Sequence, residues 1–452
     1  MDHNLDYVAC PLPEDVRRVI DHGDLAYARH LIGRRIADTR TPEVLRKRLF
    51  WELRTLEVLP EEYPMDEGTL LARLGQEIEG FTEQELIALR EEGTLDWIYL
   101  DGQIRYHALA ADTALTLSAF APRRRDREAA ERDARHRTRL DAVISEMKAE
   151  GHARYRFRLR TEAWLDSAYE RPGEPLLLHL PLPVCDAQCK PGAILAAPGA
   201  VLAAEREPQR TASWRAPCEL GKVYWTEAEW EIDAPYVEPD AQKVSADQPA
   251  FDLEEQLPQI ALTPFVRQLA RELAGEERNP LLKARRFYDY ITTRCAYRYV
   301  PPYAIVPCIP EYFGAGGRGD CGMHALLFIA LCRAGGIPAQ WQSGLYTPPW
   351  GSGMHDWARF YVEPYGWLYV DGSFGGSAYR AGNLERWNFY FGNLDPWRAV
   401  YNSALQQTFD PPKAHLRFDP YDSQTVEAEY ADGGLPRKAF TVRRELLVCQ
   451  KI

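Results

Sequence analysis

The feature that most constrains this fold is an almost wholly apolar segment, 321–334, which follows Gly319-Asp320 and ends at Gly335-Gly336. Glycines followed by a proline at 338 stop a helix, so we predict a helix over 321–334. A helix that is apolar on every side must be buried, because none of its faces suits water. We therefore expect it at the centre of a domain, with its N-terminus opening onto the floor of a pocket.

Cys321 stands at the start of this predicted helix. Unpaired backbone N–H groups and the positive end of the helix dipole favour a thiolate there and lower the pKa of the thiol. The same N–H groups can bind an oxyanion, and Gly322 leaves room for a substrate carbonyl to approach. Asp320 is expected to cap the helix. Cys332 lies among apolar neighbours and is expected to belong to the core.

Two further residues can complete a catalytic set with Cys321. His355 precedes an alternating strand at 356–363, and Asp371 ends a second strand at 366–370. A thiol nucleophile needs a base, and the base needs a third group that fixes its orientation. A symmetric turn over 364–366 would pair Arg359 with Asp371, which places Asp371 about four residues, or roughly 13 Å, along the strand from His355. A bulge or bend is then needed to bring the two together.

Four short blocks carry a family resemblance. They are Gly-Asp-Cys-Gly at 319–322, Gly-Gly-Ile-Pro-Ala at 335–339, Met-His-Asp-Trp at 354–357 and Gly-Trp-Leu-Tyr-Val-Asp at 366–371. In order and spacing they resemble the signature blocks of the transglutaminase-like superfamily, over about residues 260–380. The resemblance implies Cys321 as nucleophile, His355 as general base and Asp371 as orienting acid, and it implies that the gap between the two strands closes.

The resemblance also implies a fold of the α+β class. Its papain-like, transglutaminase-type core packs a buried helix on an antiparallel sheet. Asp356 stands where the family usually has a small residue, so it can alter the environment of the base. The segments 391–398 and 417–420 resemble an extension found in bacterial members of this group.

Other side chains are candidates for the oxyanion site or the substrate cleft. A hydroxyl from the loop before the helix could supply a second oxyanion donor, although a packed loop aromatic is the simpler interpretation of each tyrosine there. His324 lies about one turn along the helix and is expected to be a hydrogen-bonded, buried histidine. The full set of oxyanion and cleft candidates is Gly322, Tyr303, Tyr312, Trp350, Trp357 and Asp320.

A chain of 452 residues is too long for one ordinary core, and its pattern divides it into three parts. Residues 1–150 are mainly helical, with a hairpin around Asp101-Gly102 and one long helix over 126–151. Residues 151–245 contain short alternating strands and predict a β-sandwich-like module. Residues 246–452 are expected to form the catalytic domain with a C-terminal extension.

Composition excludes several functions. The net charge of −12 argues against a nucleic-acid partner, which would need clustered lysine and arginine. No stretch approaches the roughly 18 apolar residues of a membrane-spanning helix, so no membrane partner is expected. A chain with nine scattered cysteines and no visible signal peptide is expected in the cytoplasm. Cys185 and Cys189 lack a second ligand pair, so neither a metal nor a cofactor is expected.

The leading hypothesis is thiol-dependent acyl chemistry on a peptide or protein amide. Cys321 would attack the carbonyl, and water (peptidase or amidase) or an amine (transglutaminase) would resolve the acyl-enzyme; the peptidase-like outcome is preferred. The alternative is a glycan-acting enzyme, or a protein that binds glycans or peptides, on the same fold. Asp320, Asp356 or Asp371 would then carry any acid–base chemistry. The aromatic residues that could stack sugar rings are Trp341, Trp350, Trp357, Trp367, Tyr369 and Trp387.

Overall fold

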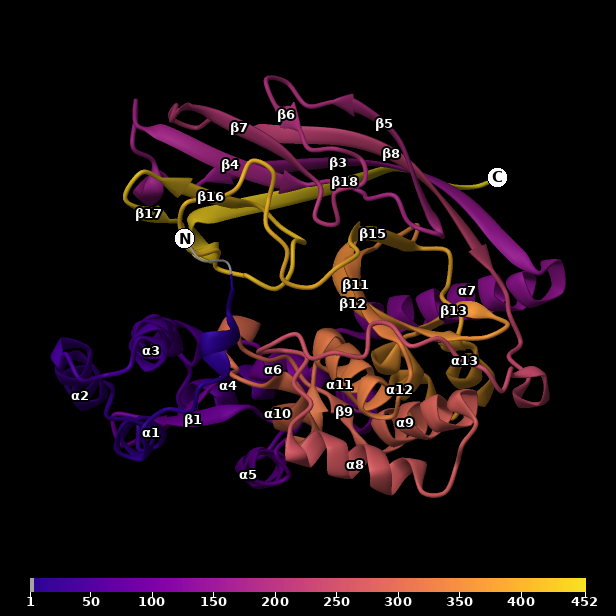
Figure 1. Ribbon diagram of the computed structural model, residues 1–452, viewed down its shortest axis with the longest axis horizontal. Helices are drawn as coiled ribbons and strands as arrows, with labels where there is room; N and C mark the ends of the chain where they lie inside the picture. The colour runs from indigo at the N-terminus through magenta and orange to yellow at the C-terminus, as the bar shows by residue number, and fades with distance from the viewer. Residues whose placement is uncertain (1–3) are drawn as a thin grey trace.

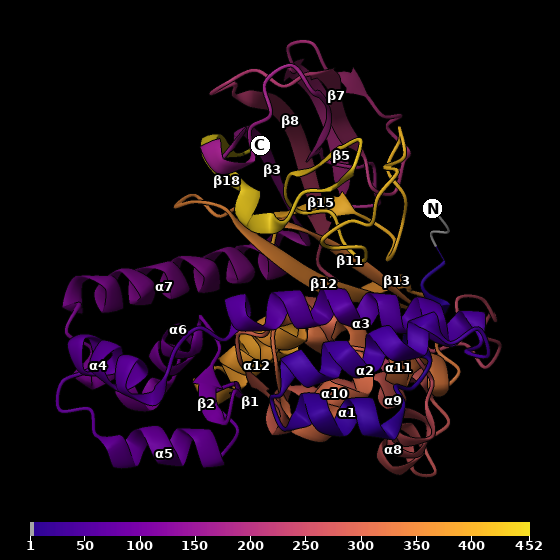
Figure 2. The same ribbon diagram turned by 90° about the vertical axis from the view of Figure 1, so that its left-hand side faces the viewer.

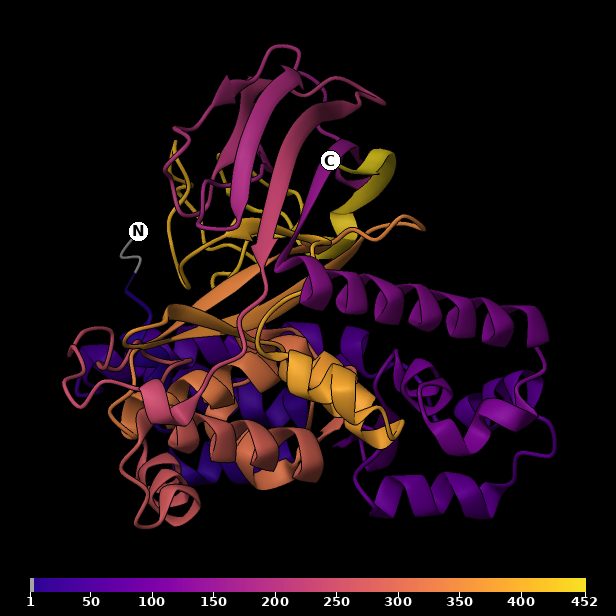
Figure 3. The same ribbon diagram turned by 90° about the vertical axis from the view of Figure 1, so that its right-hand side faces the viewer.

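A computed structural model describes residues 4–452. Figure 1 shows two layers of strands in the upper half of the molecule and a helix-rich body below them, with the first helices of the chain on the left. Turned views show that the N-terminal helices lie against one side of this body (Figure 2) and that α7 runs beneath the strands (Figure 3). No helix within 4–452 has the length and apolar character needed to cross a membrane.

The lower body contains the predicted apolar helix, α11 (Cys321–Ala334), which is buried from Gly322 to Cys332. It packs on a five-stranded sheet of order β14-β13-β12-β11-β15 and on the helices α8, α9 and α10. Consecutive strands of this sheet pair antiparallel. The α+β class, with a buried helix on an antiparallel sheet, is therefore confirmed.

The elements of this body have the following bounds: α8 (Pro264–Ala274), α9 (Pro280–Arg294), β9 (Ala296–Tyr297), α10 (Ile309–Gly316), β10 (Arg318–Gly319), β11 (Ala339–Tyr346), β12 (Gly353–Val362), β13 (Gly366–Val370), α12 (Gly372–Arg380), α13 (Leu384–Phe389), β14 (Phe391–Gly392) and β15 (Arg398–Asn402).

The upper half is built of two sheets, of orders β18-β3-β8-β5 and β17-β16-β4-β7-β6. A separate apolar cluster that includes Leu178, Trp214 and Tyr224 fills the space between them. Inward and outward residues alternate along the paired strands, as the sequence predicts for a sandwich. The strands are β3 (His152–Leu165), β4 (Pro175–Pro181), β5 (Cys189–Ala196), β6 (Val201–Leu202), β7 (Thr211–Pro217), β8 (Tyr224–Pro235), β16 (Glu427–Tyr430), β17 (Gly433–Gly434) and β18 (Phe440–Lys451).

The C-terminal strands differ from the expected domain division. Instead of extending the catalytic domain, β16 pairs with β4, and β18 pairs with β3 along most of its length. The physical reason is that β3 and β4 would otherwise expose unpaired backbone groups at sheet edges. The sandwich is therefore assembled from two separate parts of the chain, and the helix-rich body is inserted between them.

The N-terminal region is helical, as expected, with two apolar clusters of its own. The predicted hairpin is present, with Asp101 and Gly102 at positive φ, as a tight two-residue turn requires. Its elements are α1 (Glu14–Asp21), α2 (Leu25–Ala37), α3 (Glu43–Glu62), α4 (Glu67–Glu77), α5 (Glu83–Glu91), β1 (Trp97–Leu100), β2 (Gln103–Tyr106), α6 (Ala110–Leu115) and α7 (Arg127–Glu150).

The long helix α7 begins at the Asp126 cap and ends on Gly151, which adopts the left-handed conformation. Its apolar stripe does not pack within the N-terminal region, where the sequence pattern would place it. Leu140, Val143, Ile144 and Met147 instead join the main core, together with Tyr155 and Phe157 of β3 and the residues of α11. The helix thus connects the sandwich to the helix-rich body.

This arrangement predicts that residues 246–452 do not fold alone. Without β3 and β4, the strands β16 and β18 lose their hydrogen-bonding partners and the apolar residues that cover one of their faces. We expect the fragment to show no cooperative thermal unfolding transition by circular dichroism, whereas the full chain shows one. A cooperative transition in the isolated fragment would contradict the two-part sandwich.

Candidate active site

Cys321 is the first residue of α11 and is partly exposed. Asp320 is the helix cap, as predicted, and accepts a hydrogen bond from the Met323 N–H at 3.2 Å. A Cβ added at Gly322 would lie 2.1 Å from the Tyr303 hydroxyl oxygen and 2.7 Å from Asp356 Oδ2. Glycine is therefore required at this position because these two side chains approach the helix start. The sequence analysis had instead expected it to leave room for a substrate carbonyl.

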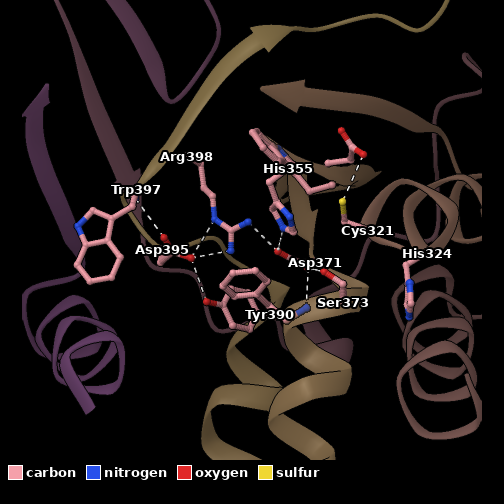
Figure 4. A network of polar contacts seen from close by, with 12 residues as sticks. Cys321, His324, His355, Asp371, Ser373, Tyr390, Asp395, Trp397 and Arg398 are labelled. Carbon is pink, nitrogen blue, oxygen red and sulfur yellow. Dashed lines mark hydrogen bonds and ion pairs between the residues drawn. The ribbon is translucent and has the colours of Figure 1, made fainter. Parts of the chain in front are cut away.

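His355 and Asp371 are in direct contact. Nε2 of His355 lies 2.7 Å from Oδ2 of Asp371, and both side chains are buried. The other ring nitrogen, Nδ1, has no recorded hydrogen bond within residues 4–452. Figure 4 shows this pair between the helix start that carries Cys321 and the side chain of Arg398.

The register of the β12–β13 hairpin explains how the gap closes. Val362 pairs with Gly366 and Ala358 with Val370, whereas the symmetric turn expected from the sequence would pair Arg359 with Asp371. The observed register places Asp371 opposite 357, two residues nearer to His355. Asp371 also leaves the strand to cap α12, where its Oδ1 accepts the Phe374 N–H at 2.9 Å. No bulge is needed.

A buried arginine completes this group and was missed from the sequence. Arg398 Nη1 donates to the same Oδ2 of Asp371 at 2.7 Å. Its Nε and Nη2 both bind Asp395 Oδ2, at 2.9 and 2.7 Å, and the hydroxyl of Tyr390 donates to that oxygen at 2.9 Å. The sequence analysis related the segment 391–398 to an extension found in bacterial members of the group, but it assigned no role to that segment. The signal available was an Asp and an Arg three residues apart, directly before a strand.

Burial governs the electrostatics of these groups. Burial lowers the pKa of His355, and although Asp371 opposes this effect, Arg398 adds to it, so the pKa stays below its ordinary value. Burial would raise the pKa of Asp371, but His355 and Arg398 outweigh that effect and hold it below its usual range. The favoured state is therefore a neutral imidazole beside an ionised carboxylate.

The thiol differs from expectation. Cys321 Sγ donates a hydrogen bond to Asp356 Oδ2 at 3.4 Å, and no hydrogen bond to His355 is recorded in the described chain. Burial, followed by the carboxylates of Asp356 and Asp320, raises the pKa of Cys321 well above its ordinary value. The predicted thiolate is therefore not the favoured form here, because burial first, and the two nearby acids second, outweigh the attraction of the helix terminus.

Asp356, next to His355 on β12, belongs to an acidic group at the helix start. Its Oδ1 accepts a hydrogen bond from Gln424 Nε2 at 2.7 Å, and the same amide donates to the His355 carbonyl at 3.0 Å. Burial, with Asp422 and Asp320 nearby, raises the pKa of Asp356 well above its ordinary value. Burial also raises the pKa of Asp320 to about 6.

The remaining candidates are scattered. Tyr303 lies at the site, and its hydroxyl donates to Asp320 Oδ1 at 2.6 Å. The hydroxyl of Tyr312 instead accepts a hydrogen bond from Arg298 at 2.6 Å. Trp350 stacks on His136 of α7 at 4.1 Å between ring centroids, so one of its faces is covered. Trp357 is 1% exposed and donates to Gln342, which places it in the core and not in a cleft.

The two other helix residues singled out from the sequence are both buried. Cys332 is fully buried in the core, as expected. His324 binds the Asp320 carbonyl through Nδ1 at 2.7 Å. Its Nε2 has no partner among the described residues, so the expectation of a hydrogen-bonded, buried histidine holds for one nitrogen only. Burial lowers the pKa of His324 to about 4, which keeps it neutral.

The N-terminal region holds the loop that covers the site. Trp51 of α3 donates through Nε1 to the Ala304 carbonyl at 2.8 Å, directly beside Tyr303. Arg298 donates to the Gly93 carbonyl at 3.1 Å, and the Tyr299 N–H donates to Thr113 at 3.2 Å. The early helices therefore fix the position of the loop that lies over Gly322.

Across residues 4–452, no set of three or more His, Cys, Asp or Glu side chains is arranged to hold a metal ion. The acidic group around Asp356 thus does not form a ready metal-binding cage.

Comparisons with known proteins bear on the region around Cys321. A sequence model of the transglutaminase-like superfamily matches residues 267–372, and no curated protein sequence matches the chain. A solved structure titled "putative cysteine protease" from Cytophaga hutchinsonii is similar over 66% of this chain and 91% of its own, with 14% identity and a TM-score of 0.39. The periplasmic domain of TgpA from Pseudomonas aeruginosa is similar over 54% of this chain and 94% of its own, with 16% identity and a TM-score of 0.28.

The matched segment begins within α8 and ends at the start of α12. It contains Cys321, His355 and Asp371, together with the helix and the strands that position them. Residues 267–372 therefore belong to the transglutaminase-like superfamily.

Proposed function

We propose that this protein is a cysteine hydrolase acting on peptide or protein amides, with Cys321 as nucleophile, His355 as base and Asp371 as the group that orients the base. The observation that carries the proposal is the 2.7 Å contact between His355 and Asp371, on strands that pack against a helix beginning with cysteine. An imidazole held neutral by burial and oriented by an ionised carboxylate is equipped to accept a proton.

In the proposed reaction the Cys321 sulfur attacks the amide carbonyl while His355 Nδ1 takes the thiol proton. The C–S bond forms, His355 returns the proton to the departing amine, and the C–N bond breaks to leave a thioester. Water then attacks the thioester with His355 as base, and the proton passes back to the sulfur as the C–S bond breaks. Backbone N–H groups at the start of α11 are placed to stabilise the oxyanion.

Hydrolysis is favoured over glycan chemistry by the surroundings of the aromatic residues. Trp341, Trp357 and Tyr369 are buried and offer no open platform to a sugar ring, and His136 covers one face of Trp350. We further propose a reducing, cytoplasmic setting, because nine free cysteines suit such a compartment.

The first prediction concerns the nucleophile. Cys321→Ala should abolish hydrolysis of a peptide-amide library, and the thioester should vanish from mass spectra of acid-quenched reactions, while circular dichroism stays unchanged. The matched control is Cys185→Ala, since Cys185 is an exposed free thiol. If turnover persists in Cys321→Ala, another residue is the nucleophile.

A second prediction concerns Arg398, which lowers the pKa of His355. Its replacement in Arg398→Met should raise that pKa, so the base becomes protonated at higher pH. The acid limb of the pH profile of kcat/KM should move upward by about one unit, the usual scale for a neighbouring charge. Arg398→Lys keeps the charge and should stay near the wild-type limb. An unmoved limb in Arg398→Met would mean that Arg398 is structural only.

A third prediction concerns the thiol. Asp356→Asn removes the carboxyl group that accepts the hydrogen bond of the thiol at 3.4 Å and that, once ionised, would repel a thiolate, so the pKa of Cys321 should fall. Alkylation of Cys321 by iodoacetamide at pH about 6.5 should become about tenfold faster, equivalent to one pKa unit. Asp432→Asn, which changes an exposed carboxylate, should have no effect. Equal rates in both variants would show that Asp356 does not control the thiol.

A further inference from the structure

The carboxyl group of Asp356 reaches the start of α11 beside the sulfur of Cys321. Its Oδ2 lies 3.4 Å from Cys321 Sγ, and a Cβ added at Gly322 would lie 2.7 Å from the same oxygen. Oδ2 therefore lies over the first turn of the helix, next to the backbone N–H groups that would stabilise the oxyanion in the proposed reaction. A group that donates a hydrogen bond from this position would be a second oxyanion donor.

The hydroxyl of Tyr303, which the sequence suggests for this role, is not free to act as the donor. A tyrosine has one hydroxyl proton, and the 2.6 Å contact with Asp320 Oδ1 takes it. The same Tyr303 oxygen lies 3.4 Å from Asp356 Oδ2. Since its own proton is directed to Asp320, Tyr303 can only accept a hydrogen bond across this second contact. The contact is therefore favourable when Oδ2 carries a proton and unfavourable when Asp356 is ionised.

Gln424 determines which oxygen of Asp356 carries that proton. Its Nε2 donates to Oδ1 at 2.7 Å, so Oδ1 is the accepting, carbonyl-like oxygen of the carboxyl group. The proton is left for Oδ2, which faces the sulfur and Tyr303. Within residues 4–452, the recorded hydrogen bonds of this side chain are to Gln424, Cys321 and Tyr303, and none of these groups is a cation.

The surroundings of Asp356 favour its neutral form as well. The residue is 5% exposed, and burial raises its pKa, followed by the carboxylates of Asp422 and Asp320. The cation Arg417 acts on Asp422 and on its neighbour Asp419. The titratable and charged groups on the elements around Asp356 are His355 on β12, Asp320 and Cys321 at the start of α11, Tyr297 on β9, Tyr303 in the loop before α11, and Arg417, Asp419, Asp422, Glu427 and Arg437 in the C-terminal part of the chain.

We propose that Asp356, protonated on Oδ2, is a further catalytic residue, which donates a hydrogen bond to the oxyanion formed when Cys321 attacks the amide. The role of the donor rests on the proposed function, whereas the proton on Oδ2 does not. Asp356 stands where the transglutaminase-like superfamily usually has a small residue, so this donor is a feature of the present chain. A buried, neutral carboxylic acid is a strong donor to a negative charge that develops beside it.

The proposed step moves no proton to or from Asp356. As the C–S bond forms, the electron pair of the C=O double bond moves to the carbonyl oxygen, and the Oδ2–H group turns from Tyr303 to that oxygen. His355 takes the thiol proton, as in the proposed reaction. When the electron pair returns and the C–N bond breaks, His355 gives its proton to the departing amine, and the Oδ2–H group turns back to Tyr303.

The first test locates the proton without any substrate. Infrared difference spectra of the full chain, prepared with isotope-labelled aspartate, compare the wild type with Asp356→Asn at neutral pH. The variant should lose the C=O stretching band of a protonated carboxylic acid. Asp432→Asn is the matched control and should lose a carboxylate band, because Asp432 is exposed and Arg171 lowers its pKa. Loss of a carboxylate band in Asp356→Asn would show that Asp356 is ionised and would overturn the proposal.

The second test separates the donor from the charge. Asparagine keeps an N–H donor in place of Oδ2–H, whereas leucine has a similar shape and no donor. On peptide amides, Asp356→Asn should keep kcat within about threefold of the wild type, and Asp356→Leu should lower kcat by about 10²–10³-fold with little change in KM, the usual cost of one oxyanion donor.

The pH profile gives a third measurement, which does not need the leucine variant to fold. The protonated form of Asp356 is present below its raised pKa and is lost as the pH rises through that value. Wild-type kcat/KM should therefore fall on the basic side, and this fall should be absent from Asp356→Asn, which has no proton to lose. A basic limb that is identical in the wild type and in Asp356→Asn would overturn the proposal.

The outcomes distinguish the donor from the proposed function. Equal kcat values in folded Asp356→Asn and Asp356→Leu, or an equal loss in both, would overturn the role of Asp356 as donor. The proposed function would stand in that case, provided that Cys321→Ala still abolishes hydrolysis. If the wild-type chain hydrolyses no peptide amide, the proposed function fails and the donor role fails with it, even where the infrared spectra show a protonated Asp356.

Discussion

The site depends on one buried oxygen atom, Oδ2 of Asp371, which is shared by the imidazole of His355 and the guanidinium of Arg398 at 2.7 Å each. A lone carboxylate at this depth would be protonated, because burial raises its pKa. Two donors reverse that effect and keep it ionised. Burying Arg398 would in turn be unfavourable without Asp395, which pairs with it and accepts a hydrogen bond from Tyr390. The orientation of His355 therefore depends on a series of paired groups that extends away from the site.

This chain of groups continues into contacts between the helix-rich body and the rest of the molecule. Arg398 begins β15, whose neighbour in the sheet is β11, and the Val400 carbonyl of β15 accepts the Val184 N–H from the sandwich module at 2.9 Å. Asp186 of the same module binds Arg359 and Gln342 in the sheet. The sandwich therefore supports the strands behind His355, while the N-terminal helices hold the loop that lies in front of Cys321. The parts of the chain outside the family segment act on the site from two sides.

The sequence allowed the central helix, the hairpin at Asp101 and the sandwich strands to be predicted, because each depends on local periodicity, caps or turns. The contact between His355 and Asp371 was expected from the family resemblance. It did not allow the hairpin register to be predicted, since the observed shift of two residues keeps every side chain on the same face of the sheet and leaves the hydrophobic pattern unchanged. Arg398 and the C-terminal strands were missed for a related reason. Asp371, to which Arg398 donates, lies 27 residues away, and β18 pairs with a strand far away along the chain, so no local pattern marks these partners. Asp395, three residues before Arg398, was the one local signal.

The sign of the charge around the thiol is the least expected property of the site. A helix terminus favours a thiolate, yet burial, followed by the carboxylates of Asp356 and Asp320, reverses the preference and raises the pKa of Cys321. In this arrangement Cys321 remains a neutral thiol, so under the proposed mechanism its proton has to leave as the sulfur attacks. The imidazole of His355 is held neutral by burial, and its Nδ1 has no recorded hydrogen bond within residues 4–452, whereas its Nε2 is held by Asp371. The group that accepts the thiol proton is therefore set by the folded chain before the substrate binds.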